Sequence, residues 1–176
     1  YWTVQAYNGT TYSPASPISY FSTLVPQPVL TSDLSQNTDG PGFNAADGNY
    51  ATTVTDAQVP TTGPPLSVAR AYNSRDPRSS GAFGAGWSSL LDMGAVNGQV
   101  DSSGNAHTVN VTYPDGQEVA FGENADGSFT PPPGRYAELA SASGGWTLTD
   151  KADTVYTFKV PTAGIAPFTL GKVSLG

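Results

Sequence analysis

The stretch TVNVTYPDGQEVAF, residues 108–121, indicates the fold of this chain. Apolar and polar residues alternate over residues 109–113, which is the period-two pattern of a strand with one buried face. The turn sequence Pro-Asp-Gly follows at residues 114–116, and a second apolar run occupies residues 118–121. Two strand patterns separated by such a turn predict an antiparallel hairpin.

This hairpin is one of a series of short strand patterns along the chain. The segments between them are turn sequences, such as Asn-Ala-Asp-Gly at residues 124–127 and Asp-Lys-Ala-Asp at residues 150–153. Short strands at such spacing are typical of antiparallel sheets, and no stretch predicts a helix of three turns. We therefore expect an all-β fold arranged as an antiparallel meander. The expected strands are residues 1–7, 17–24, 50–54, 66–72, 88–96, 107–113, 117–122, 136–142, 146–149 and 155–160.

Composition supports this fold class and excludes several functions. The 176 residues include 20 Gly and 15 Pro, which interrupt helices, and only 12% are charged. The net charge of −7 disfavours binding to nucleic acid or to an anionic membrane, because phosphate groups repel an acidic surface. No apolar run predicts a membrane span, and no signal peptide precedes the first strand. The sequence starts in mid-pattern without Met, so we expect a piece of a longer, secreted or cell-surface protein.

The chain divides into three expected segments. Residues 1–24 form a hairpin around Asn8-Gly9, a dipeptide suited to tight hairpin turns. Residues 25–47 are rich in Pro, Gly, Asn, Ser and Asp, which predicts a linker or a segment ordered by lying on a neighbour. Residues 48–176 contain the remaining strands. Apolar residues occupy both faces of residues 118–121 and 155–158, so we expect these strands to contact protein on more than one side.

Side chains with catalytic or metal-binding chemistry are sparse. There is no Cys, and the single histidine, His107, has no serine-nucleophile motif to accompany it. Glu118, Glu123 and Glu138 are the glutamates available for glycosidase chemistry, and most Asp residues are explained by turns. The Asp39-Gly40 and 124–127 turns do not complete a calcium loop. We expect no catalytic site, no metal and no cofactor.

Residues 63–93, GPPLSVARAYNSRDPRSSGAFGAGWSSLLDM, resemble the entry segment of the bacterial Rhs (rearrangement hotspot) proteins. In that family a strand with Leu, Arg and Tyr-Asn-Ser is followed by a Gly-x-Gly-Trp segment and a Pro-Asp-Gly hairpin, in the order found here. The resemblance extends from about residue 49 to residue 158. The residues that carry it, and that we expect to fix the sheet geometry, are Arg70, Tyr72, Asn73, Ser74, Gly84, Gly86, Trp87, Pro114, Asp115 and Gly116.

The Rhs resemblance implies a particular architecture and role. Rhs and Tyr-Asp (YD) repeat proteins, with teneurins and the Tc-toxin cocoon as relatives, wind a β-sheet into a hollow shell around a C-terminal toxin. This chain would then form the first layers of the spiral shell and cap it, without enzymatic activity. Its partners would be the rest of the shell and the enclosed toxin. The hairpin of residues 1–24 resembles the last two strands of a fibronectin type III module, and no complete YD repeat occurs in the chain.

Two alternatives remain open from the sequence. One is a carbohydrate- or cell-wall-binding module, in which exposed Trp2, Trp87 and Trp146 would stack on sugar rings. The other is a fragment of a glycoside hydrolase that uses one of the glutamates. Under the shell hypothesis Trp87 is a buried core residue, and its replacement by Ala is expected to cost about 3–5 kcal/mol.

Overall fold

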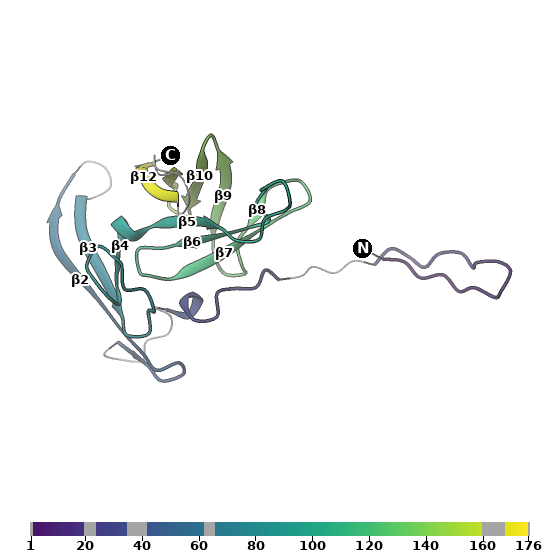
Figure 1. Ribbon diagram of the computed structural model, residues 1–176, viewed down its shortest axis with the longest axis horizontal. Helices are drawn as coiled ribbons and strands as arrows, with labels where there is room; N and C mark the ends of the chain where they lie inside the picture. Colours follow the sequence, from purple (N-terminus) through teal and green to yellow (C-terminus); the bar gives the residue numbers. More distant parts are fainter. Residues whose placement is uncertain (1, 20–23, 35–41, 62–65, 160–167, 176) are drawn as a thin grey trace.

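The computed structural model describes residues 2–19, 24–34, 42–61, 66–159 and 168–175 (Figure 1). Within these residues the fold is all-β, as predicted, and the only helical turns are two 3₁₀ helices, η1 (Thr31–Asp33) and η2 (Leu90–Asp92). The part of the chain so described contains no helix long and apolar enough to cross a membrane. The strands form two bodies, a four-stranded sheet and a closed barrel.

The four-stranded antiparallel sheet has the order β1-β2-β3-β4. Its central pair, β2 and β3, forms a long hairpin with a bulge between Thr55 and Ala57. The outer strands are short: β1 pairs with β2 only at residues 49–50, and β4 pairs with β3 only at residues 70–72. Most of β2 therefore has one edge without a neighbouring strand in the described sheet. The strands are β1 (Phe43–Asn44), β2 (Asn49–Val59), β3 (Leu66–Asn73) and β4 (Trp87–Ser89).

The remaining eight strands follow one another as an antiparallel meander that closes into a barrel, because β12 pairs with β5. The closing seam consists of two residue pairs, Phe168 with Ala95 and Thr169 with Gly94. A second thin region involves β8, which pairs with β9 at one position. The barrel strands are β5 (Gly94–Asn97), β6 (Thr108–Thr112), β7 (Glu118–Glu123), β8 (Phe129–Thr130), β9 (Ala137–Ala142), β10 (Gly145–Asp150), β11 (Thr154–Lys159) and β12 (Phe168–Leu175).

The hydrophobic core fills the inside of this barrel. Inward residues of β6, β7, β10 and β11 are buried, among them Val109, Phe121, Leu148 and Phe158, each with 0% of its surface exposed. Alternation along the strands explains this, since every second residue of a barrel strand points inward. An eight-stranded barrel has an interior narrow enough for side chains to fill, and these buried residues pack there as one hydrophobic cluster.

Several expectations from the sequence are corrected by the structure. The strand predicted over residues 88–96 is two strands, β4 and β5, separated by η2, because the Ser89 hydroxyl accepts the Leu91 N–H (3.1 Å) and starts a 3₁₀ turn. Strands β1, β8 and β12 were not predicted. The meander is present, but β5 to β12 form a closed barrel and not the layers of an open spiral. The Asp39-Gly40 turn lies outside the described residues.

The N-terminal hairpin is a narrow ribbon that extends away from the barrel (Figure 1). Trp2 pairs with Ser19 and Tyr7 pairs with Tyr12 around the predicted Asn8-Gly9 turn. The returning arm therefore begins near Tyr12 and not at residue 17, as the sequence had predicted. Trp2, Tyr7 and Tyr12 are all about half exposed or more.

Residues 24–34, here called the strap, lie along β7 of the barrel. The side-chain amide of Gln27 accepts the Ala120 N–H (2.9 Å) and donates to the Ala120 carbonyl (3.0 Å). It thus makes the two hydrogen bonds that a neighbouring strand would make, at a part of β7 beyond the reach of β8. Thr31 donates to Glu118 (2.5 Å) at the far end of the strap. The strap explains why Ala120, on the outer face of β7, is 2% exposed, and it confirms that this strand contacts protein on both faces.

Candidate functional site

The residues singled out by the sequence meet where the sheet joins the barrel. Three of them form a stack on one face of the sheet. The rings of Tyr72 and Trp87 are 5.2 Å apart, and the guanidinium carbon of Arg70 lies 4.5 Å from the Trp87 ring centroid. Arg70 also pairs with Asp56 on β2 (2.9 Å). The arrangement follows from register, because Tyr72 of β3 lies directly opposite Trp87 of β4.

Trp87 in this stack is half-buried and is not part of the hydrophobic core. The prediction that Trp87 is a core residue is therefore wrong. The reason is that β4 belongs to the four-stranded sheet, whereas the core of the chain lies inside the barrel.

Asn73, the last residue of β3, connects the sheet to the barrel. Its amide nitrogen donates to the carbonyl of Asp115 (2.8 Å), in the turn between β6 and β7. Its amide oxygen accepts a hydrogen bond from Asn49 Nδ2 (2.9 Å), at the start of β2. Asn49 and Asn73 are each 1% exposed. Buried amides at this depth require their partners, so the contact fixes the position of the Asp115 turn relative to the sheet.

The neighbouring glycines have specific conformational roles. Gly86 has φ +74° and lies against Tyr72, so that a Cβ at this position would be 2.7 Å from Tyr72 Cε2. Gly116 has φ +87° in the Pro-Asp-Gly turn, where residues other than Gly are strained. Gly84 also has a positive φ, +92°, but faces open space. Ser74 accepts the Tyr50 N–H (2.8 Å) and continues the β2–β3 pairing beyond the strand.

A second connection, which sequence reasoning missed, is made by Arg78. Its guanidinium donates to the Gly116 carbonyl and pairs with Asp76 (2.7 Å), whose side chain is 1% exposed. Burial alone would lower the pKa of Arg78, but the hydrogen bond and charge of Asp76 and the charge of Glu118 outweigh it and raise that pKa. Arg78 therefore stays charged and ties the loop after β3 to the barrel. The signal available in the sequence was the Arg-Asp-Pro-Arg segment itself, at residues 75–78.

We define the joint by its five connecting residues, Asn49, Asn73, Arg78, Asp115 and Gly116. Pro114 precedes Asp115 in the same turn, and Ser74 directly follows β3. Eight of the ten motif residues therefore lie in the joint, in its turn or in the sheet segment next to it, and Gly84 and Gly86 lie in the loop before β4. This arrangement positions two bodies with respect to each other. Over the described residues, no group of three or more His, Asp and Glu side chains could hold a metal ion.

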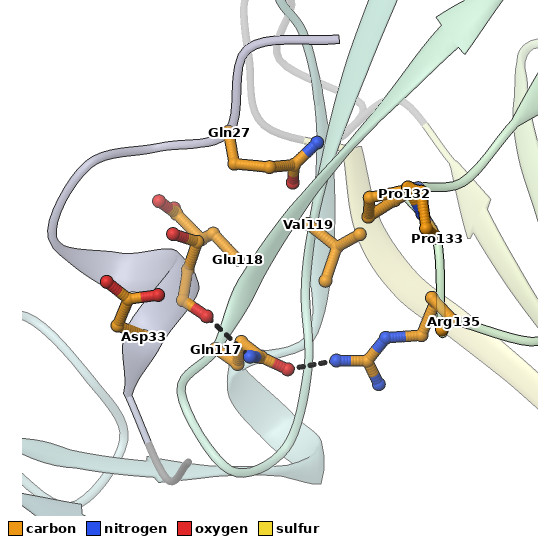
Figure 2. A pocket seen from close by; sticks show the side chains of 10 residues that line it. Gln27, Asp33, Gln117, Glu118, Val119, Pro132, Pro133 and Arg135 are labelled. Atoms are coloured by element: carbon orange, nitrogen blue, oxygen red, sulfur yellow. Dashed lines mark hydrogen bonds between the residues drawn. The ribbon is translucent and has the colours of Figure 1, made fainter. Parts of the chain in front are cut away.

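A cavity of about 520 Å³ lies between the strap and β7 next to the joint (Figure 2). Asp33 and Glu118 line it on the strap side, and Pro132, Pro133 and Arg135 line the opposite side. Gln117 spans its floor, donating to the Ser32 carbonyl (2.5 Å) and accepting from Arg135. Gln117 and Glu118 are both engaged in hydrogen bonds, and the cavity separates the strap from the loop before β9.

Arg135 also covers Tyr113, with its guanidinium carbon 4.4 Å from the ring centroid. The Tyr113 hydroxyl is buried and has no hydrogen-bond partner among the described residues. Burial raises the pKa of Tyr113 to about 12, against an ordinary value of 10.0.

The remaining chemical candidates are dispersed. His107 is half exposed, and its Nδ1 lies 2.5 Å from Glu123 Oε2. Glu138 is exposed on β9. Trp146 is 7% exposed in the barrel core, where its ring meets Phe129 edge-on and its indole N–H donates to Asn97 Oδ1 (3.0 Å). It therefore has no free face for a sugar ring.

Comparison with known proteins agrees with the location of the joint. Residues 42–121 match the family model described as a domain of unknown function, DUF6531, and this range contains the whole joint. The chain is also 32% identical over 112 residues to the tRNA nuclease WapA of Bacillus subtilis (strain 168) and to the tRNA3(Ser)-specific nuclease WapA of Bacillus spizizenii. The matched segment is 64% of this chain and 4% of each relative. The region is thus homologous to a small part of the WapA proteins.

Proposed function

We propose that this chain is a non-enzymatic structural segment of a secreted or cell-surface toxin-delivery protein of the Rhs/YD-repeat type. In this proposal it starts and caps the β-shell that encloses a C-terminal toxin domain. The similarity to WapA supports the proposal, since WapA is a tRNA nuclease and the matched segment is only 4% of its length. The partners are the remaining strands of the same shell and the enclosed toxin, and the segment itself needs no cofactor and binds no nucleic acid.

The observation that carries the proposal is the joint between an open sheet and a closed barrel. Over the described residues, the long strand β2 has an edge without a neighbouring strand for most of its length, and such an edge can accept a further strand. The barrel strands close on themselves, so in this proposal the barrel is the cap and the wall continues from the sheet. Asn73 and Arg78 hold the cap at a fixed angle to the wall. Their role is positioning, and the other motif residues support the same geometry.

The N-terminal segments have separate parts in this proposal. Residues 1–24 are the end of a fibronectin type III-like module, and residues 25–47 are a plug segment. Gln27 and Thr31 form hydrogen bonds to β7. These bonds favour a plug that lies on the barrel and disfavour a loose tether. Glycan binding is less well supported, because Trp146 lies in the core and Trp87 is covered by Tyr72 and Arg70.

The experiment that tests the proposal is limited proteolysis with intact-mass analysis on the complete polypeptide that carries this segment. We expect one large resistant body that includes residues 42–159 and retains a C-terminal fragment until the protein is denatured. In an Asn73→Ala variant the resistant body should be cleaved at the joint, whereas an Asn105→Ala variant in an exposed loop should behave as the unmodified protein. Release of residues 1–176 as an independent, resistant unit would overturn the shell hypothesis.

A further inference from the structure

The tip of the N-terminal hairpin contains an Asn-Gly dipeptide in an unusual setting. The sequence has two such dipeptides, Asn8-Gly9 and Asn97-Gly98. Asn8 and Gly9 are both exposed, and they reverse the ribbon through the Asn8 N–H bond to the Thr11 carbonyl (3.2 Å).

The side chain of Asn8 is held by the backbone that follows it. Its Oδ1 accepts the N–H groups of Thr10 (3.0 Å) and Thr11 (2.9 Å). Two N–H donors on one carbonyl oxygen stabilise negative charge that develops on that oxygen when its carbon is attacked. Such donors form an oxyanion-hole arrangement around the Asn8 side-chain amide.

The backbone nitrogen of Gly9 is the adjacent nucleophile. Over the residues that the structure describes, the Gly9 N–H has no hydrogen-bond acceptor. Gly9 has φ +95°, and no atom lies within 4 Å of where a Cβ would stand. Neither a side chain nor a hydrogen bond therefore hinders approach of this nitrogen to the Asn8 side chain.

We propose that Asn8 is a site of spontaneous self-modification, in which its amide is converted to an acid through a cyclic imide. The Gly9 nitrogen forms a bond to Asn8 Cγ, and the bond from Cγ to the Asn8 side-chain nitrogen breaks. The Asn8 side-chain nitrogen takes up the proton lost by the Gly9 nitrogen and leaves as ammonia. A solvent water molecule then opens the five-membered imide at either carbonyl. The products are aspartate and isoaspartate, and the reaction consumes one water and needs no oxidant or reductant.

Asn97-Gly98 provides a matched contrast within the same chain. Over the described residues, Asn97 Oδ1 accepts the indole N–H of Trp146 (3.0 Å) in place of the two following backbone N–H groups that Asn8 Oδ1 accepts. The Gly98 N–H donates to the Thr108 carbonyl (2.8 Å), so its nitrogen is engaged in a hydrogen bond. The folded barrel therefore protects Asn97, whereas the hairpin leaves Asn8 open to reaction.

Conversion of Asn8 has structural consequences at the hairpin. Either product adds a negative charge to a chain that already carries −7. Isoaspartate also places an additional carbon in the main chain at the turn. The pairing of Tyr7 with Tyr12, whose rings are 4.6 Å apart, depends on that turn and should be lost.

The test follows each site by peptide mass spectrometry after incubation of the 176-residue chain at neutral pH. The incubation is run in buffer and in concentrated urea, with water enriched in heavy oxygen to mark hydrolysis of the imide. We expect Asn8 to convert in buffer at least as fast as in urea. Asn97 should convert in buffer at no more than about one tenth of its rate in urea, a factor that corresponds to about 1.4 kcal/mol in the activation barrier. An Asn8→Gln variant should remove the fast signal. The proposal is overturned if Asn8 converts about tenfold slower in buffer than in urea, or no faster than Asn97 in buffer.

Discussion

Replacement of Asn73 by Ala is expected to destabilise the chain substantially through the loss of two hydrogen bonds, one buried and one part-buried. The change leaves the Asn49 amide nitrogen and the Asp115 carbonyl without the partners that lie at 2.9 and 2.8 Å. Leaving the buried Asn49 amide unsatisfied costs about 1–3 kcal/mol, and loss of the part-buried bond to Asp115 costs about 0.5–1.5 kcal/mol. We therefore expect a loss of about 1.5–4.5 kcal/mol in the free energy of unfolding. Urea denaturation followed by tryptophan fluorescence measures this loss, since Trp87 lies in the sheet and Trp146 in the barrel.

Two further variants separate the hydrogen bonds from other effects. Asn105→Ala removes an amide that bonds only to exposed Asp101, and it should change the free energy of unfolding by less than about 0.5 kcal/mol. Asn49→Ala removes the other half of the Asn pair, so its effect combined with Asn73→Ala should be smaller than the sum, by about 0.5–3 kcal/mol. A loss below about 1 kcal/mol for Asn73→Ala would refute the claim that Asn73 joins the two bodies. Strict additivity with Asn49→Ala would refute the contribution of the Asn49–Asn73 hydrogen bond.

Trp146→Ala should cost about 3–5 kcal/mol of unfolding free energy, whereas Trp87→Ala, in its half-buried stack, should cost about 1–3 kcal/mol. Urea melts in which Trp87→Ala is the more destabilising variant would contradict the placement of the core. Tyr113→Phe should be near neutral at pH 7. The pKa of Tyr113 is raised to about 12 in the folded state, above an unfolded value of 10.0, so its contribution to stability is complete below pH 10 and is lost as the pH rises towards 12. The Tyr113→Phe variant should not show this loss of stability in melts across this pH range. Gln27→Glu replaces the donor to the Ala120 carbonyl by an acceptor. Hydrogen exchange at the Ala120 amide should therefore accelerate about tenfold, while exchange in core strand β10 is unchanged. If the Ala120 amide exchanges equally slowly in the variant and the unmodified chain, the strap is held by other contacts.

The strands that the sequence predicted are those with alternating residues or good turn chemistry. Residues 109–113 and the Pro-Asp-Gly turn are examples, because period two and a positive-φ glycine are local properties. Barrel closure was not predictable in this way. It depends on β8, which is two residues long, and on β12, which lies in a stretch with both small and polar residues. The last barrel strand, β12, pairs with the first one, β5.

The joint was predicted only in part, and for a physical reason. Asn73 and the Asp115 turn were identified through a family resemblance, whereas Asn49, Arg78 and Gln27 were not. Each of these three acts through long-range hydrogen bonds to the main chain or to another amide. A polar residue near a turn looks the same in sequence whether it faces water or a partner far along the chain, so only the folded arrangement distinguishes them.

The thin seam between β5 and β12 has a consequence for synthesis. A ribosome releases β5 early, and its closing partner is the last strand of the barrel to emerge. Until then the nascent meander is an open sheet with its apolar face uncovered, and contacts between distant parts of a chain form slowly. The strap emerges before any barrel strand, so it is available to cover the edge of β7 as soon as that strand forms. Order of translation thus favours early shielding of one edge, while the seam itself depends on the final strand.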